Sequence, residues 1–442
     1  MRQTLFYIPE TLFAIPLFGW GFGLGLLVAI VIIAHCYQYI RHRNVSGIGG
    51  SLAFLGIGGA VLVFVLPNLV EPECGVPIRG YGFCLLLAIL AALALLLHLA
   101  KRQNIETEKV FSLAVWTVIT GIVGARLFYV TQYWRETFLD HTGQVLPLGE
   151  SIFRFFNFAQ GGLVVFGSIL GGALGAFIFI HRNKMPVLRT FDIISPAAML
   201  GIAIGRIGCL LNGCCFGGIV SDASWSIVFP TGSPAHVHQV AHGDVFLYGL
   251  KFEEVNIGGR TMFAIAEVQT ESEADTLGLK PKMVLAWNVQ SRRELAAILI
   301  DTYETAPNER VRLDFFTNSS HTEAAPFWLA PTASDVLPVH PTQIYSSGLA
   351  LLLCGILFCL GRLRFYRQRD GLVFASFMIL YSVGRFGIEF VRTDEGSFFG
   401  TGLTISQNVS IVVCLTGIAL LVYKLRHTTR GNRVLSSVPE SH

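Results

Sequence analysis

Long apolar runs constrain this chain more than any other feature. Runs of about 20 apolar residues are long enough to cross a bilayer as helices. Nine such runs occur, at about 13–35, 50–70, 81–100, 111–130, 160–181, 190–212, 343–361, 371–391 and 404–424. The sequence therefore predicts an all-α polytopic membrane protein of about nine transmembrane helices. The first run is longer than a signal-peptide core and lacks a small-residue cleavage site, so we expect it to be retained.

Composition agrees with this class and excludes others. Only 14% of the 442 residues are charged, whereas soluble domains carry roughly 25%. The mean hydropathy is +0.58. A net charge of +3 is too small to indicate a nucleic-acid partner, so the bilayer itself is the partner that composition predicts.

The distribution of basic residues predicts the orientation. Lysine and arginine gather in every second loop, at 41–43, 101–109, 182–189 and 362–369, and again in the tail after 424. The positive-inside rule then places the N-terminus outside and the C-terminus in the cytoplasm. The expected divisions are extra N-terminal spans at 1–75, a membrane core at 76–218 and 343–425, and a cytoplasmic tail at 426–442.

The segment 219–342 interrupts the core and is too long and polar to be a linker. It falls on the outer face, and its short apolar runs around a helical stretch at 292–303 predict a small α+β insert. The region 255–318 weakly resembles a PDZ domain, although no carboxylate-binding loop is evident. A faint repeat of 15–22 at 76–83 indicates either duplicated helices or chance similarity.

Three arginines lie inside predicted spans: Arg126, Arg206 and Arg385. A charge at the bilayer centre costs about 2.5 kcal/mol or more, so each is a candidate functional residue. All three lie toward the outer ends of their helices. The sequence therefore predicts a site for an anion near the outer leaflet.

The span at 371–391 carries a polar stripe. Tyr381, Arg385, Glu389 and Arg392 stand at helical spacings that keep them on one face. A structural Arg–Glu ion pair explains part of this stripe. One glutamate cannot pair with arginines from several helices, however, and the planar fork of arginine matches phosphate.

Several motifs together resemble those of the prolipoprotein diacylglyceryl transferase family, over roughly 76–424. They include Gly205-Arg-Ile-Gly208, Asn212-Gly213 with Gly217, and the stripe at 381–392. The others are Tyr81-Gly82, Gly124-Ala-Arg-Leu127, Gln160-Gly-Gly162, His340-Pro-Thr-Gln-Ile-Tyr345 and Gly402-Leu-Thr-Ile-Ser-Gln407.

The resemblance implies transfer of the diacylglyceryl group of phosphatidylglycerol to the lipobox cysteine of a prolipoprotein, near its signal peptide. A thioether forms, glycerol phosphate leaves, and no cofactor is implied. Arginines suit stabilisation of a phosphate leaving group. The implied catalytic residues are Tyr81, Arg206, His340, Arg385 and Glu389, and the implied substrate-binding residues are Arg126, Gln160, Gly161, Asn212, Gly217, Tyr381 and Arg392.

The chain also departs from the family pattern. The family histidine after Gln-Gly-Gly falls at Phe166, and Cys209 and Cys214 replace a frequent asparagine and glutamate. These changes leave the general base open among His340, Glu389 and the field of the arginines. His340 has an alternative role as a capping residue, and Glu389 as the partner of Arg385.

Two other functions remain open: a weakened relative that binds lipid without transfer, and an anion transporter. Midplane charges and comparable repeated halves would favour a transporter. His236, His238 and His242 allow a zinc site, but solvated loop histidines are expected and no metal is predicted. Most cysteines are expected to pack as small hydrophobic residues; the vicinal Cys214 and Cys215 either oxidise or pack at a helix end.

Overall fold

The computed structural model describes most of the chain. The described residues are 4–12, 15–17, 21–42, 55–56, 58–59, 62–63, 66–70, 74–138, 145–156, 164–220, 225–257, 260–287, 289, 291–305, 309–316, 323–330, 336–392 and 402–435. They fall into two compact units. One comprises Met1–Leu85 with Ile207–Pro341, and the other comprises Leu86–Arg206 with Thr342–His442.

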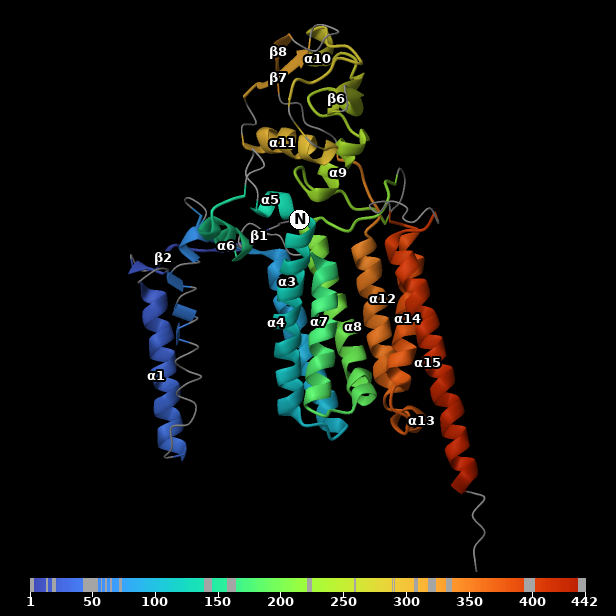
Figure 1. Ribbon diagram of the computed structural model, residues 1–442. Coiled ribbons are helices and arrows are strands. Elements are labelled where there is room, and N and C mark those ends of the chain that lie inside the picture. Colours follow the sequence, from blue (N-terminus) through green and yellow to red (C-terminus); the bar gives the residue numbers. More distant parts are fainter. Residues whose placement is uncertain are drawn as a thin grey trace, which may run out of the picture. The chain divides into compact units, whose positions relative to one another are not determined.

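Six helices in the described part of the chain are long and apolar enough to cross a membrane (Figure 1). They are α3 (Gly80–Arg102), α4 (Thr107–Gln132), α8 (Val187–Asn212), α12 (Thr342–Leu360), α14 (Leu372–Glu389) and α15 (Ile405–Leu435). The prediction of a polytopic membrane protein is thus confirmed.

Two further predicted spans are shorter as apolar helices. Helix α7 (Val165–Arg182) is apolar from Phe166, and α1 (Phe22–His42) is apolar over Phe22–Ile33. The span expected at 50–70 lies largely outside the described residues, which include a short 3-10 helix, η2 (Leu66–Leu69). Fewer spans of full length are therefore found among the described residues than the nine predicted.

The extreme N-terminal part differs from the expected helix starting near 13. Residues before α1 form β1 (Thr4–Ile8), β2 (Thr11–Leu12) and β3 (Ile15–Pro16). Strand β1 pairs antiparallel with β4 (Val76–Arg79), which leads directly into α3. Proline lacks the N–H that a helix interior requires, which is consistent with the extended backbone at Pro16.

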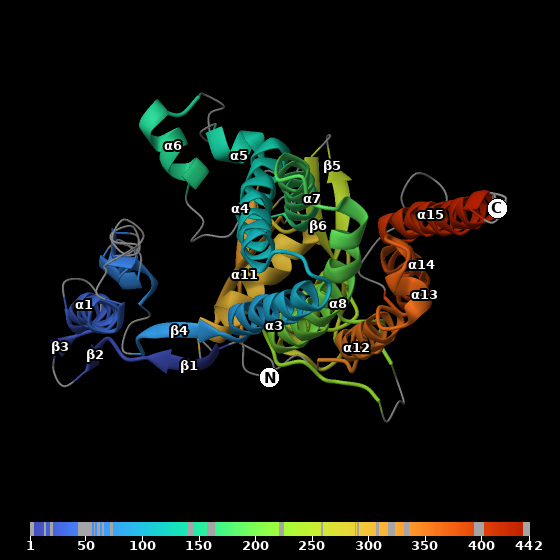
Figure 2. The same ribbon diagram turned by 90° about the horizontal axis from the view of Figure 1, so that it is seen from below.

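Helices α4 and α7 pack closely because glycines face each other across their contact, and Figure 2 shows the two helices side by side. A Cβ added at Gly124 would lie 2.4 Å from the Gly167 oxygen and 2.8 Å from the Gly171 Cα. Small residues at such positions let membrane helices approach until their backbones touch. This contact fixes the part of α4 that carries Arg126.

Hydrogen bonds from polar side chains join α8 to α12 and α14. The Ser347 hydroxyl on α12 donates to the Ala203 carbonyl of α8 at 2.8 Å. Asp192 on α8 accepts from the backbone N–H of Gly371 at 2.6 Å and of Phe374 at 2.8 Å. A carboxylate from one helix therefore caps the N-terminus of another.

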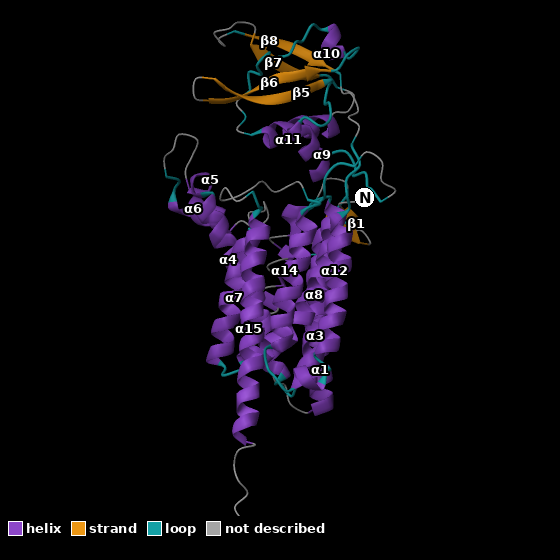
Figure 3. Ribbon diagram, turned by 90° about the vertical axis from the view of Figure 1, so that its right-hand side faces the viewer, coloured by secondary structure: helices purple, strands orange, loops and turns teal. Residues whose placement is uncertain are grey.

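In the other unit, residues 234–330 form short helices and two β-hairpins around one apolar core (Figure 3). The hairpins are β5 (Leu250–Ile257) with β6 (Arg260–Val268), and β7 (Val311–Phe316) with β8 (Ala324–Leu329). Bridges from Val284 to Ala264 and from Leu285 to Phe315 join them. The helices are α9 (Pro234–His242), α10 (Glu273–Thr276) and α11 (Arg292–Thr305).

Three short helices complete the description. They are α5 (Trp134–Phe138), α6 (Leu148–Phe156) and α13 (Arg364–Arg367). Helix α6 is strongly amphipathic, and it carries exposed Leu148 and Ile152. It follows α4 in sequence and receives the side chain of Arg126.

Candidate functional site

The predicted stripe on α14 contains a buried ion pair. Arg385 pairs with Glu389 one turn further along the helix, and the side chains are 15% and 0% exposed respectively. The other guanidinium nitrogen of Arg385, Nη2, donates to the Ser406 hydroxyl on α15 at 2.8 Å. The Arg–Glu pair is thus found as expected, and a residue of α15 joins it.

Ser406 is held in place by the start of α15. The Thr404 hydroxyl accepts from the Gln407 N–H at 3.2 Å, and the Gln407 side chain accepts from the Thr404 N–H at 3.1 Å. This reciprocal pattern is a capping box, which satisfies two helix-terminal donors. The motif at 402–407 therefore begins α15 and orients Ser406 toward Arg385.

Two other residues of the stripe have different surroundings. Tyr381 lies one turn before Arg385 and stacks on Phe377 at 5.7 Å between ring centroids. Arg392 lies just beyond the end of α14, where its backbone N–H bonds the Glu389 carbonyl at 3.2 Å. The stripe therefore leads from an apolar helix interior to a polar helix end.

Arg206 is a charge without a partner in the part of the chain that the structure describes. It lies near the C-terminal end of α8 and is half-buried. Among the described residues, it makes neither a hydrogen bond nor an ion pair. The described residues thus leave the electrostatic cost of this charge within a membrane helix uncompensated. An anionic ligand would compensate it.

Arg126 is already engaged by backbone carbonyls. It is 5% exposed, and it donates from Nε to the Phe155 carbonyl at 2.8 Å and from Nη2 to the Arg154 carbonyl at 2.5 Å. These carbonyls belong to the last turn of α6, where the helix dipole favours a cation. Arg126 therefore anchors α6, a contact that its sequence position did not predict.

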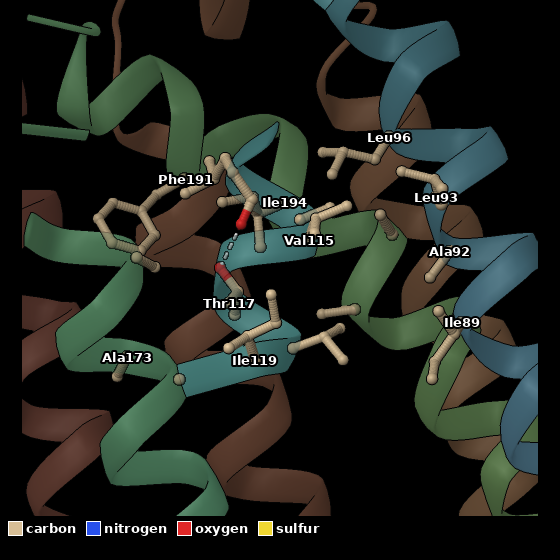
Figure 4. A pocket seen from close by; sticks show the side chains of 17 residues that line it. Ile89, Ala92, Leu93, Leu96, Val115, Thr117, Ile119, Ala173, Phe191 and Ile194 are labelled. Carbon is tan, nitrogen blue, oxygen red and sulfur yellow. Dashed lines mark hydrogen bonds between the residues drawn. The ribbon is translucent and has the colours of Figure 1, made fainter. Parts of the chain in front are cut away.

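An apolar cavity of about 560 Å³ lies deeper along the same helices (Figure 4). Its lining comes from α3, α4, α7 and α8, and includes Ile89, Leu96, Ile119, Ala173 and Ile194. The Thr117 hydroxyl is turned to the Leu113 carbonyl at 2.7 Å, so it leaves no free donor there. The apolar lining of this cavity favours the binding of hydrocarbon chains.

The arginines and this cavity occupy different depths. Ile119 precedes Arg126 by seven residues on α4 and Ala198 precedes Arg206 by eight on α8, which is about 10–12 Å along a helix axis. The C-terminal ends of α4, α8 and α14 lie at the same end of the helices in Figures 1 and 3. This arrangement matches a molecule with an anionic head and apolar tails.

The unit that begins at Met1 contains the predicted residues Tyr81, Asn212, Gly217 and His340. A Cβ added at Gly208 would lie 3.3 Å from the Tyr81 ring and 3.0 Å from the Cys84 Cβ, so the start of α3 packs on the end of α8. The Gly217 N–H donates to the His340 carbonyl at 2.9 Å, and the His340 N–H donates to the Gly218 carbonyl at 3.1 Å. Backbone pairing therefore brings Gly217 beside His340.

Asn212 is the last residue of α8. Gln160 and Gly161 lie outside the described residues. Phe166, at the family histidine position, lies in the first turn of α7 and is 51% exposed. Sequence reasoning missed Ser347 and Asp192, although a buried carboxylate in an apolar run is itself a signal.

The three histidines lie on α9, and the expectation of solvated loop residues is wrong for His236. Its side chain is buried, and Nδ1 accepts from the Gly232 N–H at 3.1 Å. Burial lowers the pKa of His236 to about 4. His238 and His242 stack with ring centroids 3.9 Å apart. No metal-binding group among the described residues includes these histidines.

Comparisons with known proteins agree on one family. A family model described as prolipoprotein diacylglyceryl transferase matches residues 67–423. A phosphatidylglycerol–prolipoprotein diacylglyceryl transferase of Rhodopirellula baltica is 33% identical over 96% of this chain and 90% of its own length. Similar proteins bear the same name in Clostridium perfringens, where it is numbered 2 (26% identical, 78% and 91%), and Synechococcus elongatus (27%, 82% and 89%).

Proposed function

Since this chain belongs to the prolipoprotein diacylglyceryl transferase family, we propose that it transfers the diacylglyceryl group of phosphatidylglycerol to a prolipoprotein cysteine. The cysteine sulfur forms a bond to the glycerol carbon as the bond from that carbon to the phosphate oxygen breaks. The electron pair leaves with glycerol phosphate, and the thiol proton passes to an acceptor. The product is a thioether-linked lipid.

The unpaired charge of Arg206 carries this proposal. It lies half-buried near a helix end without an ion-pair or hydrogen-bond partner among the described residues. A phosphate group supplies the missing anion and accepts the planar fork of arginine. The apolar cavity deeper along α4 and α8 suits the acyl chains of the same lipid.

Arg385 is the second proposed phosphate-stabilising group. Its contacts with Glu389 and Ser406 fix the guanidinium before substrate binds. Fixed charges stabilise a leaving group without reorganising during the reaction. In this proposal Glu389 orients Arg385, while Tyr81, Asn212, Gly217, Tyr381 and Arg392, with Gln160 and Gly161, contact the headgroup or peptide.

Thiol activation requires an acceptor other than Phe166, whose ring takes up no proton. Glu389 is committed to Arg385 in a buried ion pair. His340 is half-buried beside Gly217, and it remains the proposed side-chain base. The cationic surroundings also favour the thiolate form of a substrate cysteine.

The proposed setting is the outer face of the bacterial cytoplasmic membrane. Basic loops at 101–109, 182–189 and 362–369 support cytoplasmic loops at that end of the spans. The insert at 219–342 then faces outward, where it would steer prolipoprotein chains. Deletion of 251–330 should lower turnover of a lipobox peptide; unchanged turnover would dismiss steering.

A direct assay tests the transferase proposal. The purified full-length protein is incubated with phosphatidylglycerol and a lipobox peptide, and the mass of the peptide is measured by mass spectrometry. We expect the mass of one diacylglyceryl group on the cysteine peptide and none on a peptide with serine at that position. Absence of modified peptide with a folded protein would contradict the activity.

A lipid-binding relative without transfer is the second candidate, because Phe166, Cys209 and Cys214 depart from the family pattern. Complementation of a transferase-deficient strain separates the two functions. Growth with lipidated prolipoprotein supports the enzyme. Lipid binding without complementation supports the second candidate.

A further inference from the structure

Three cysteines converge at the end of α8. Cys209 lies in the last turn of the helix, and Cys214 and Cys215 follow it. Their three Sγ atoms all lie within 4.8 Å of one another. All three residues are half-buried, so the sulfur atoms are neither sealed in a core nor spread over the surface. This is the one such group among the residues that the structure describes.

The helix end brings two of these sulfurs together. Gly213 adopts a positive φ of 74°, its N–H bonds the Leu210 carbonyl at 3.2 Å, and the Cys214 N–H bonds the Cys209 carbonyl at 3.1 Å. This pair of bonds is a Schellman motif, which places the residue after the glycine against the residue five positions earlier. An ordinary apolar contact would satisfy that geometry.

The third sulfur requires an unfavourable backbone. Cys215 has a φ of 59°, a left-handed conformation that costs a residue with a Cβ about 1 kcal/mol. Asparagine or glycine normally occupies such positions. Here the turn instead brings a third thiol to the other two, and the Cys214 thiol donates to the Cys209 carbonyl at 3.7 Å. Helix capping alone does not explain this third sulfur.

The spacing fits a thiophilic metal ion. Zinc–sulfur bonds of about 2.3 Å in a tetrahedral site place the sulfurs about 3.8 Å apart. The 4.8 Å limit observed here is about 1 Å wider, which side-chain rotation can close. Thiolates select zinc and other soft ions over magnesium or calcium. Three protein ligands with one open position are typical of catalytic zinc rather than structural zinc.

We propose that Cys209, Cys214 and Cys215 hold a Zn²⁺ ion whose fourth position receives the prolipoprotein thiol. This inference rests on the proposed transferase function. A thiol loses its proton when it binds zinc, and that proton passes to His340, the proposed side-chain base, so no base is required where Phe166 stands. The zinc-bound sulfur then attacks the glycerol carbon, and glycerol phosphate leaves with the electron pair. The neutral thioether binds zinc weakly and dissociates.

The sequence around the cluster supports this use. Cys209 follows Arg206 by three residues on α8, and Cys215 precedes Gly217 by two. The proposed zinc ligands thus lie within the motif that carries the proposed phosphate-binding arginine. One short segment would supply both the nucleophile site and the leaving-group site.

Metal content and spectroscopy test the site without relying on activity. The full-length protein is purified with reductant, loaded with Zn²⁺, and freed of excess metal. We expect about one zinc per chain, at least tenfold less in Cys209→Ser, Cys214→Ser and Cys215→Ser, and no loss in Cys354→Ser. Thermal unfolding of each variant shows whether it is folded, and chelation of the wild type provides a measurement without mutation.

Substitution of Co²⁺ reports the open position. Adding a lipobox cysteine peptide should strengthen the thiolate-to-cobalt charge-transfer band, and a serine peptide should leave it unchanged. No stoichiometric zinc, a disulfide among the three cysteines, or no response to the cysteine peptide would each overturn the proposal. Wild-type transfer by the triple serine variant would overturn it while leaving the transferase function intact. Zinc binding with a cobalt response but no thioether product would instead contradict the transferase function.

Discussion

Arg385 and Ser406 join two membrane helices through one hydrogen bond, 2.8 Å from guanidinium Nη2 to hydroxyl Oγ. The same guanidinium pairs with Glu389 on its own helix. Two neighbouring partners hold the planar group in one orientation before a ligand arrives. Preorganisation of this kind is what stabilisation of a leaving phosphate requires.

Replacement of Arg385 tests that preorganisation. Arg385→Ala should reduce transfer at least about 100-fold, the magnitude typical of a lost charge-stabilising group. Arg385→Lys should also lose most activity, because an ammonium group cannot reproduce the planar fork. Ser406→Ala should lower activity less, and Ser410→Ala, one turn further along α15, should retain it. Full turnover by Arg385→Ala would exclude Arg385 from the site.

Asp192 should be important for stability rather than chemistry. Its carboxylate caps α14 through the N–H groups of Gly371 and Phe374. Asp192→Ala leaves both donors without that acceptor, at a cost of about 2 kcal/mol or more. We expect a lower unfolding temperature in detergent, with a much smaller change for the exposed neighbour in Asp370→Asn. Equal unfolding temperatures for wild type and Asp192→Ala would refute the capping role.

The glycine contact between α4 and α7 should tolerate no side chain. In Gly124→Ala the new Cβ meets the Gly167 oxygen at 2.4 Å, and we expect destabilisation of about 1–3 kcal/mol. Gly355→Ala on α12 is the matched control, since no other segment of the described chain lies within 4 Å of its added Cβ. The measurement is the unfolding temperature of each variant. Similar values for Gly124→Ala and Gly355→Ala would contradict a close backbone contact between α4 and α7.

His236 predicts a pH dependence for the α9 region. Burial lowers its pKa to about 4 in the folded protein, whereas the unfolded value is about 6.5. The unfolded state therefore binds more protons between these values, and stability falls as pH decreases from 6.5 toward 4. The protection factors of α9 amides against hydrogen exchange, which correct for the intrinsic exchange rate at each pH, should fall in wild type as the pH decreases over that range. In His236→Gln this pH dependence should weaken. A pH profile identical to that of wild type would assign the effect to another titratable group.

The sequence predicted the polytopic class because apolar length alone determines whether a helix can cross a bilayer. It also predicted the Arg385–Glu389 pair, since residues four apart share a helix face. The strands before α1 were not predicted, because an apolar segment has no unambiguous periodicity there. Contacts between helices were missed for a similar reason: nothing in local sequence links Arg126 to the end of α6 or Asp192 to the start of α14.

The cysteines show how a backbone conformation changes an interpretation. Their spacing matches no common zinc motif, so packing at a helix end was the simpler expectation. The positive φ at Cys215 cannot be read from the sequence, yet it brings the third sulfur to the other two. Burial of His236 was hidden likewise, because it depends on how α9 packs against the core around α11.

Lipid binding by Arg206 tests the account most directly. Wild type and Arg206→Ala are compared, with Ile207→Ala as a control, by native mass spectrometry after equilibration with equal amounts of phosphatidylglycerol and a neutral lipid lacking phosphate. We predict that wild type and Ile207→Ala retain phosphatidylglycerol selectively. In Arg206→Ala the ratio of bound phosphatidylglycerol to bound neutral lipid should fall at least tenfold, which corresponds to about 1.4 kcal/mol. Undiminished selectivity in a folded Arg206→Ala protein would contradict a phosphate site at this arginine.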